Sequence, residues 1–254
     1  MRVIVTRPPA ESERWSGELR ERGFDAVALP LIEIGAPAEP AAVRAAWASL
    51  GTFRAVMFVS ANAVHQFFAH APAGVGWPAA TRAWATGAGT RHALLDTDLP
   101  PSRIDAPPPD AAQFDSETLW GHVGAQVRAG DRVLIVRGAD ADGNEGRDWL
   151  AARLQQAGAQ VETVVSYMRR VPAWTDAQRA VAAQTVHDGS TWIFSSSQAI
   201  AHLERLMPQL DFARSRAIAT HPRIAQAARD AGFGVVCESR PVIDAVVAAL
   251  ESIG

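Results

Sequence analysis

Apolar and polar residues alternate along this chain in a pattern that predicts short buried strands separated by helices. Residues 3–6 (VIVT) form the first apolar run, after which Pro8 and Pro9 open a helix that Gly23 closes. Similar apolar runs recur at residues 26–29, 55–60, 82–86, 132–137, 161–167, 191–195, 216–220 and 235–238. Segments of helix length lie between them, ending with residues 241–252. This alternation predicts an α/β fold with parallel sheets covered on both faces.

The chain also contains an imperfect internal repeat. VIVTRP at 3–8 aligns with VLIVRG at 133–138, so that Arg7 corresponds to Arg137. FVSANAV at 58–64 aligns with FSSSQAI at 194–200, so that Ser60 corresponds to Ser196. In one half the strand that leads to the arginine comes last, and in the other it comes first. We therefore predict two similar α/β domains, one inserted into the other.

Two segments that interrupt the periodicity are the predicted linkers, at about residues 31–40 and 168–174. The first is rich in proline, and the second follows Tyr167 directly. The predicted discontinuous domain comprises residues 1–35 and 172–254, and the predicted inserted domain comprises residues 36–167, so that the linker is two-stranded. A tandem arrangement is the alternative, but it would leave an isolated strand–helix–strand unit at the N-terminus.

The amino-acid composition excludes several kinds of catalytic and metal-binding site. All 24 basic residues counted as Lys or Arg are arginine, and the chain has one tyrosine and one cysteine. Chemistry that needs a lysine amine, an internal disulfide or several thiolates on zinc is therefore excluded. A formal charge of -3 gives no electrostatic support for a role on nucleic acid or membrane surfaces. No apolar run resembles a signal peptide or a membrane span, so we expect a cytoplasmic protein.

Residues that directly follow the predicted strands are the candidate binding residues, because ligands of open parallel sheets lie beyond the carboxyl ends of the strands. Small residues there leave backbone N–H groups at helix starts available to anions. The alternative is that each is only a helix cap or a tight turn. Together they would suit a large polycarboxylate or polyphosphate. The candidates are Arg7, Ser60, Ala61, Asn62, Gly87, Thr90, Arg137, Gly138, Ser195, Ser196 and Ser197.

Other motifs are weaker. Residues 140–145 (DADGNE) look like a calcium loop, but the glycine is misplaced and the terminal carboxylate is missing, so a solvated loop is favoured. Neither a Ser-His-Asp triad nor a paired-carboxylate site can be assembled, so an enzyme with this sequence would rely on positioning and electrostatics. Tyr167 ends a predicted strand at the second linker, where it is either a core aromatic or a ligand contact.

These residues resemble the uroporphyrinogen-III synthase family. The resemblance rests on VTRP at 5–8, FVSANAV at 58–64, GAGT at 87–90, VRG at 136–138, VVSYMRR at 164–170 and FSSSQAI at 194–200. It implies two flavodoxin-like domains joined by a two-stranded linker. The implied reaction converts hydroxymethylbilane, a linear octacarboxylate tetrapyrrole, to uroporphyrinogen III without metal or organic cofactor. The bilane loses its terminal hydroxyl as water and closes through a spiro intermediate with its last ring inverted.

The resemblance also implies roles for single residues. The family tyrosine that assists departure of the hydroxyl maps to Tyr167, whose phenol can donate a proton. One turn departs from the family pattern, because His221 and Ile224 stand where a glycine and a threonine are common. We expect His221 and Arg223 to supply carboxylate contacts there instead.

The sequence is also compatible with two other function classes. One is a glycosyltransferase that uses a nucleotide sugar, although no nucleotide contact is found in the sequence. The other is a non-catalytic two-domain sensor or binding protein for a small ligand. For this protein we expect a monomer with no metal site.

Overall fold

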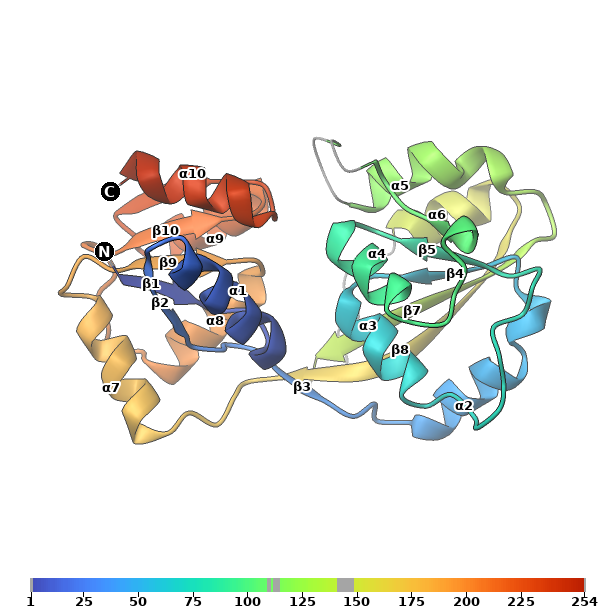
Figure 1. Cartoon of the computed structure of the whole chain (residues 1–254), viewed down its shortest axis with the longest axis horizontal. Helices are drawn as coiled ribbons and strands as arrows, with labels where there is room; N and C mark the ends of the chain where they lie inside the picture. The colour runs from blue at the N-terminus through green and yellow to red at the C-terminus, as the bar shows by residue number, and fades with distance from the viewer. Residues whose placement is uncertain (1, 109–110, 112–114, 141–148, 254) are drawn as a thin grey trace. The chain divides into compact units, whose positions relative to one another are not determined.

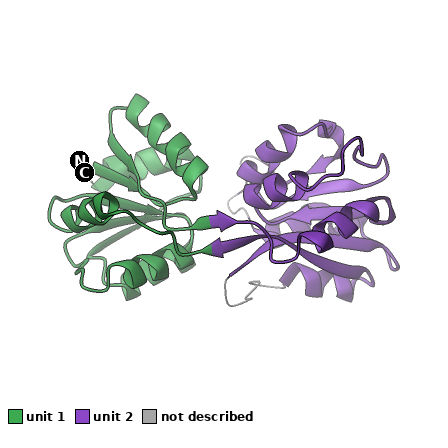
Figure 2. Ribbon diagram, turned by 90° about the horizontal axis from the view of Figure 1, so that it is seen from below, with its two compact units in different colours: residues 1–33, 170–254 green, residues 34–169 purple. Residues whose placement is uncertain are grey.

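The computed structural model describes residues 2–108, 111, 115–140 and 149–253, and the chain divides into two compact units (Figure 1). Unit 1 combines Met1–Glu33 with Arg170–Gly254, and unit 2 is Ile34–Arg169. Figure 2 shows the two units in different colours, with both segments of unit 1 in green. The mixed α/β fold with two parallel sheets, as predicted from the alternating pattern, is confirmed.

Within its described residues, unit 1 contains a five-stranded sheet in the order β11-β10-β9-β1-β2. The strands are β1 (Arg2–Val5), β2 (Asp25–Ala28), β9 (Thr191–Phe194), β10 (Arg216–Ala219) and β11 (Val235–Glu238). The helices are α1 (Pro9–Glu21), α7 (Asp176–Thr185), α8 (Ser197–Leu206), α9 (Pro222–Asp230) and α10 (Ile243–Ile253). All of the strand pairs are parallel. Numbered along the chain, the sheet order is the 2-1-3-4-5 order of flavodoxin-like folds.

Alternation along the strands of unit 1 divides its core between the two faces of the sheet. Val3, Val5 and Ile193 pack with Trp15 and Leu19 of α1 and with Val246 and Leu250 of α10. Trp192 and Phe194 lie parallel to each other and contact Phe233, and Trp192 also contacts Phe212. Both faces are covered, as a parallel sheet requires.

The second sheet has the order β3-β8-β7-β4-β5-β6 in the described residues. Its strands are β3 (Glu33–Gly35), β4 (Ala55–Phe58), β5 (Arg82–Ala85), β6 (Ile104–Asp105), β7 (Arg132–Asp140) and β8 (Gln160–Arg170). The helices are α2 (Pro40–Ala48), α3 (Ala61–Phe68), α4 (Ala88–Leu95), α5 (Ser116–Val123) and α6 (Trp149–Gln156). Short 3₁₀ turns occupy Leu50–Thr52, Pro101–Arg103 and Gly124–Gln126.

The internal repeat is a repeat of one sheet order. The order β6-β5-β4-β7-β8 in unit 2 matches β11-β10-β9-β1-β2 in unit 1, strand for strand. The strand before Ser60 thus corresponds to the strand before Ser196, and the strand before Arg7 corresponds to the one that carries Arg137. The chain enters the two sheets at different strands, which explains why the repeated motifs occur in a different order.

Two details of the sequence interpretation were wrong. Arg137 and Gly138 lie inside β7 and not in a turn, and Tyr167 lies inside β8 and not at its end. The pairing of β7 with β8 continues as far as Asp140, which lies opposite Arg169. The side chains of these two residues form an ion pair of 2.7 Å. The segment 31–40 also contains a strand, β3, which joins the sheet beside β8.

Candidate functional site

Most of the candidate residues lie where neighbouring strands lead to helices on opposite faces of each sheet, whereas Arg137, Gly138 and Tyr167 lie inside strands. In unit 1, β1 pairs with β9 through Val5 and Ile193, and Arg7 and Ser195 follow two residues later. In unit 2, β4 pairs with β7 through Phe58 and Val136, followed at the same spacing by Ser60 and Gly138. These strand pairs are the topological switch points at which open α/β sheets bind ligands. In each unit the two repeated motifs therefore lie on neighbouring strands: the motif with the arginine (Arg7 or Arg137) and the motif with the serines (Ser195 or Ser60).

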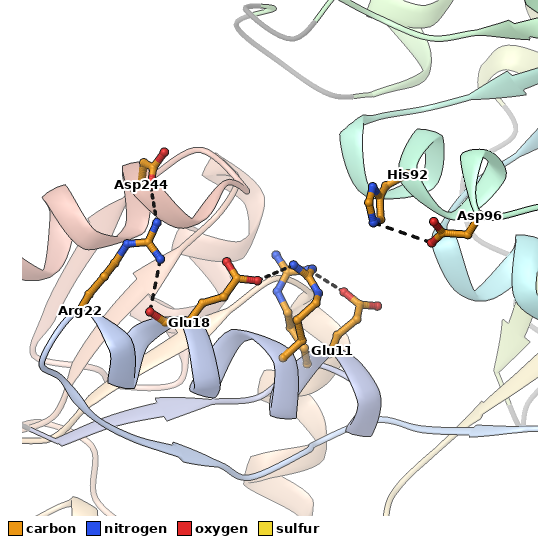
Figure 3. A network of polar contacts seen from close by, with 8 residues as sticks. Glu11, Glu18, Arg22, His92, Asp96 and Asp244 are labelled. Carbon is orange, nitrogen blue, oxygen red and sulfur yellow. Dashed lines mark hydrogen bonds and ion pairs between the residues drawn. The ribbon is translucent and has the colours of Figure 1, made fainter. Parts of the chain in front are cut away.

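Arg7 is held firmly in unit 1. Its guanidinium forms a 2.8 Å ion pair with Glu11 and lies 3.9 Å over the ring of Trp15. Figure 3 shows Glu11 in the row of ion pairs along α1. Burial lowers the pKa of Arg7 from its ordinary value, and the charge of Glu11 opposes this effect. The buried Nε of Arg7 has no hydrogen-bond partner among the residues that the structure describes, so the side chain retains a donor in a partly desolvated position.

The three serines after β9 lie in different environments. The hydroxyl of Ser195 is buried and has no hydrogen-bond partner in the described part of the chain. Ser196 caps α8, because its Oγ accepts a hydrogen bond from the Gln198 backbone N–H at 3.2 Å. Ser197 is exposed at the first position of the helix. Ser195 is therefore the serine with an unused buried hydroxyl, whereas Ser196 has the capping role that the alternative interpretation foresaw.

Ser60 and Tyr167 meet in unit 2. The Oγ of Ser60 caps α3 by accepting a hydrogen bond from the Ala63 N–H, and it lies 3.1 Å from the phenolic oxygen of Tyr167. The Tyr167 side chain is only 3% exposed and packs in the same core cluster as Phe67. Tyr167 is paired with Gly138 on β7. The structure thus joins three candidate residues, although the sequence pattern gave no sign that Ser60 and Tyr167 are in contact.

The remaining candidates of unit 2 differ in accessibility. Ala61 and Asn62 form the half-buried first turn of α3. Gly87 is the N-cap residue of α4, and because glycine has no side chain it does not cap the first backbone N–H groups of that helix. Thr90 and Arg137 are each only 5% exposed. Of these residues, Gly87 with its half-buried backbone is the one best suited to meet an anion.

The unusual turn of unit 1 is a histidine cap. The Nδ1 of His221 accepts a hydrogen bond of 3.1 Å from the Arg223 backbone N–H at the start of α9. Because Nδ1 accepts, the proton of the neutral imidazole is on Nε2, which is left as a donor. The Arg223 side chain is exposed, whereas Ile224 is buried. His221 therefore has the capping role that is usual for Ser, Thr, Asn or Asp.

No cluster of three or more His, Cys, Asp or Glu that could hold a metal ion occurs among the described residues. Most of the calcium-like motif at 140–145 lies outside the described residues, and only Asp140 can be placed, in its ion pair with Arg169. None of the helices in the described part of the chain is long and apolar enough to span a bilayer.

Sequence reasoning missed Ser166. Its hydroxyl donates to the carbonyl oxygen of Ala63 at 3.3 Å, and the register of β7 with β8 shifts at this point. Val164 and Tyr167 nevertheless pack into one core cluster. Side chains three residues apart in a regular strand face opposite sides, so their shared face is the signal of a β-bulge.

Fold and candidate residues together define a two-unit α/β protein with two doubly wound parallel sheets and its polar candidates at two switch points. The family profile described as uroporphyrinogen-III synthase HemD matches residues 13–248. A uroporphyrinogen-III synthase of Salmonella typhimurium (strain LT2) is 31% identical over 240 residues, which cover 92% of each chain. The chain belongs to the uroporphyrinogen-III synthase family, and it is an enzyme of heme biosynthesis, a cyclising lyase.

The chain is also similar to further uroporphyrinogen-III synthases. A uroporphyrinogen-III synthase of Synechococcus elongatus is 28% identical over 207 residues, which cover 81% of this chain and 74% of that one. The solved uroporphyrinogen-III synthetase of Helicobacter pylori 26695 is similar over 100% of both chains, with a TM-score of 0.60 and 18% identity. A mutant uroporphyrinogen III synthase of Thermus thermophilus has a TM-score of 0.58 at 15% identity and covers 100% of this chain and 98% of its own. These structures share the fold.

Proposed function

We propose that this chain cyclises hydroxymethylbilane to uroporphyrinogen III, and that Tyr167 donates the proton with which the terminal hydroxyl leaves as water. The observation that carries the proposal is the 3.1 Å contact between the Tyr167 hydroxyl and Ser60. It places a phenol at the switch point of unit 2, beside the N-terminus of α3. This is the position at which a ligand of such a sheet is expected.

The hydrogen bonds around Ser60 favour a direction for the proton. The Oγ of Ser60 already accepts from the Ala63 N–H, so its own proton is available for the phenolic oxygen. If Ser60 donates to Tyr167, the phenolic proton remains free for the leaving hydroxyl of the substrate. A hydrogen bond accepted by the phenolic oxygen also stabilises the negative charge that develops on it as the proton leaves.

The substrate is an octacarboxylate, and each unit, taken by itself, has groups at its strand ends that can bind carboxylates. In unit 1, Arg7 offers a buried Nε that has no hydrogen-bond partner in the described part of the chain, Ser195 offers a buried hydroxyl, and His221 offers Nε2. The exposed Ser197 and Arg223 lie at the starts of α8 and α9. In unit 2, the start of α4 after Gly87 has no side-chain cap from Gly87 and offers backbone N–H groups.

This distribution of carboxylate-binding groups suits a reaction whose product depends on the conformation in which the substrate is held. Hydroxymethylbilane closes to the type I isomer without a catalyst, so the enzyme has to hold the chain for the closure that inverts the last ring. Fixed contacts with the acid groups provide that control, and one proton donor assists the departure of water. The proposal needs no cofactor.

A product assay tests the proposal. Freshly prepared hydroxymethylbilane is incubated with the protein, and the products are oxidised and separated into type I and type III porphyrins. We expect type III porphyrin to exceed the amount in a control without protein. A type I mixture identical to that control would contradict the proposed function and would favour a binding protein without turnover.

Tyr167→Phe tests the role of the phenol. The change removes one hydroxyl and keeps the ring that packs in the core, so the unit should remain folded. We expect kcat for type III formation to fall on the order of 10²-fold, the usual contribution of a positioned proton donor, with little change in KM. Circular dichroism checks the fold, and an unchanged kcat would reduce Tyr167 to a packing residue.

A further inference from the structure

We propose that Gly138 and a β-bulge at Ser166 are positioning elements that aim the hydroxyl of Tyr167. This inference rests on the proposed function of Tyr167 and adds two residues that touch the tyrosine from the neighbouring strand and from its own strand. Both act on Tyr167 and not on the substrate. Three separate observations in unit 2 support it.

The first observation is the register of β8. Arg137 lies opposite Val165, whereas the next residue, Gly138, lies opposite Tyr167. Ser166 is therefore the extra residue of a bulge, and from there onward every side chain of β8 changes face. Without the bulge, Tyr167 would lie on the face opposite to Val164. With it, both pack in the core cluster that also contains Phe58 and Phe67.

The second observation is the space above Gly138. A β-carbon built on this residue would lie 2.8 Å from Cε1 of Tyr167 and closer still to Cζ and Cε2. The aromatic ring therefore lies directly on the glycine backbone. Gly138 is absent from the glycines with positive φ, so its backbone conformation would accept other residues. The ring of Tyr167, which supplies the three atoms nearest to the built β-carbon, is therefore the reason for glycine here.

The third observation is the connection to α3. Ser166 donates to the carbonyl oxygen of Ala63 at 3.3 Å, and Ser60 caps the same helix through the Ala63 N–H. The phenolic oxygen of Tyr167 contacts Ser60 at 3.1 Å. The bulge and the tyrosine are thus both tied to the first turn of α3, while Gly138 supports the ring from β7. Together these contacts fix the direction of the hydroxyl.

Gly138→Ala tests the inference, with Gly121→Ala as the matched control. Gly121 lies in α5 of the same unit, and a β-carbon there would meet nothing within 4 Å. We expect Gly138→Ala to lower kcat for type III formation on the order of 10²-fold, because a displacement of about 1 Å at a reacting group has effects of that size. KM should change little, and Gly121→Ala should behave as the unchanged enzyme.

A second readout separates positioning from general damage. Tyr167 is the single tyrosine of the chain, so ring-labelled tyrosine gives NMR signals from this residue alone. Gly138→Ala should shift those signals, and Gly121→Ala should not. In the Tyr167→Phe background, Gly138→Ala should cost only a small further factor in kcat. An equal loss in both backgrounds, or an unchanged kcat beside a defective Tyr167→Phe, would overturn the inference while leaving the proposed function intact.

Ser166→Ala covers the case in which Gly138→Ala does not fold. It removes the hydroxyl that ties the bulge to Ala63 and leaves the size of the side chain nearly unchanged. We expect a smaller loss of kcat than with Gly138→Ala, together with shifted Tyr167 signals. Unshifted signals and unchanged kcat would count against the bulge. An unaffected Tyr167→Phe enzyme would remove the basis of both the proposed role of Tyr167 and this inference.

Discussion

Ser60 and Ser196 both cap helices, but Ser60 makes a second contact that Ser196 lacks within the described part of the chain. They occupy equivalent places in the repeat, and each accepts a backbone hydrogen bond at the start of its helix. Ser60 has in addition the contact with Tyr167. Ser196 can therefore serve as the control for experiments on Ser60.

Replacing each serine by alanine should separate the two tasks. Both Ser60→Ala and Ser196→Ala should lower the free energy of unfolding by about 1 kcal/mol, the usual cost of a lost N-cap. Only Ser60→Ala should also lower kcat, because only Ser60 touches the phenol. Chemical denaturation and steady-state kinetics measure the two effects. Equal kinetic losses in the two variants would contradict a role of Ser60 in holding Tyr167.

Arg7 and Arg14 form a second matched pair. Both form ion pairs with a glutamate four residues later, at 2.8 and 2.7 Å, but the Arg7 side chain is 13% exposed and that of Arg14 is 59% exposed. Arg7→Gln should raise KM for hydroxymethylbilane about 10-fold, the effect of losing one charged hydrogen bond. Arg14→Gln should leave KM unchanged. The same KM in both variants would show that Arg7 serves only the structure of α1.

At the level of elements, two glycines end equivalent helices in the same way. Gly23 after α1 has φ of 88°, and Gly158 after α6 has φ of 84°. In both places the following residue donates back to a buried leucine, Leu19 or Leu154, as in a Schellman motif. The positive φ explains why glycine ends both of these helices.

Alanine at these two sites should destabilise the units unequally. Gly23→Ala should cost about 1 kcal/mol of unfolding free energy from the left-handed backbone alone. Gly158→Ala should cost more, because its β-carbon would also lie 2.9 Å from Cβ of Ala129. Denaturation followed by circular dichroism measures both. A smaller effect at Gly158 than at Gly23 would contradict the steric argument.

The elements also show what the sequence could and could not predict. Strands such as β1, β4 and β9 are continuous apolar runs, so burial on both faces identifies them directly. The ends of β7 and β8 depend on pairing between Asp140 and Arg169, which neither strand reveals alone. The contact of Tyr167 with Ser60 spans 107 positions and depends on the bulge. Local patterns do not contain such long-range contacts.

At the scale of the whole molecule, the two units differ in how the chain builds them. Unit 2 is one continuous segment, Ile34–Arg169, whereas unit 1 needs two segments. In unit 1, β1 lies between β2 and β9. Without β1, the β9 strand becomes a sheet edge, and its buried Trp192 and Ile193 lose the strand beside them.

Excised segments should therefore behave differently. Residues 34–169 should fold alone and unfold cooperatively on heating, because their sheet is complete apart from the ends of β3 and β8. Residues 170–254 should remain unfolded unless residues 1–33 are supplied, for example joined by a short flexible linker. Circular dichroism and amide NMR dispersion measure both. A cooperatively folded 170–254 segment would contradict the central role of β1.

The position of β1 also orders the events of synthesis. The strand and its partner β2 are made before unit 2, but the neighbour on the other side of β1 is made only after the whole of unit 2. Protein domains generally fold as units while the chain is being translated. Unit 2 can consequently fold while the nascent β1 still lacks half of its hydrogen-bonding partners, and unit 1 is completed after unit 2.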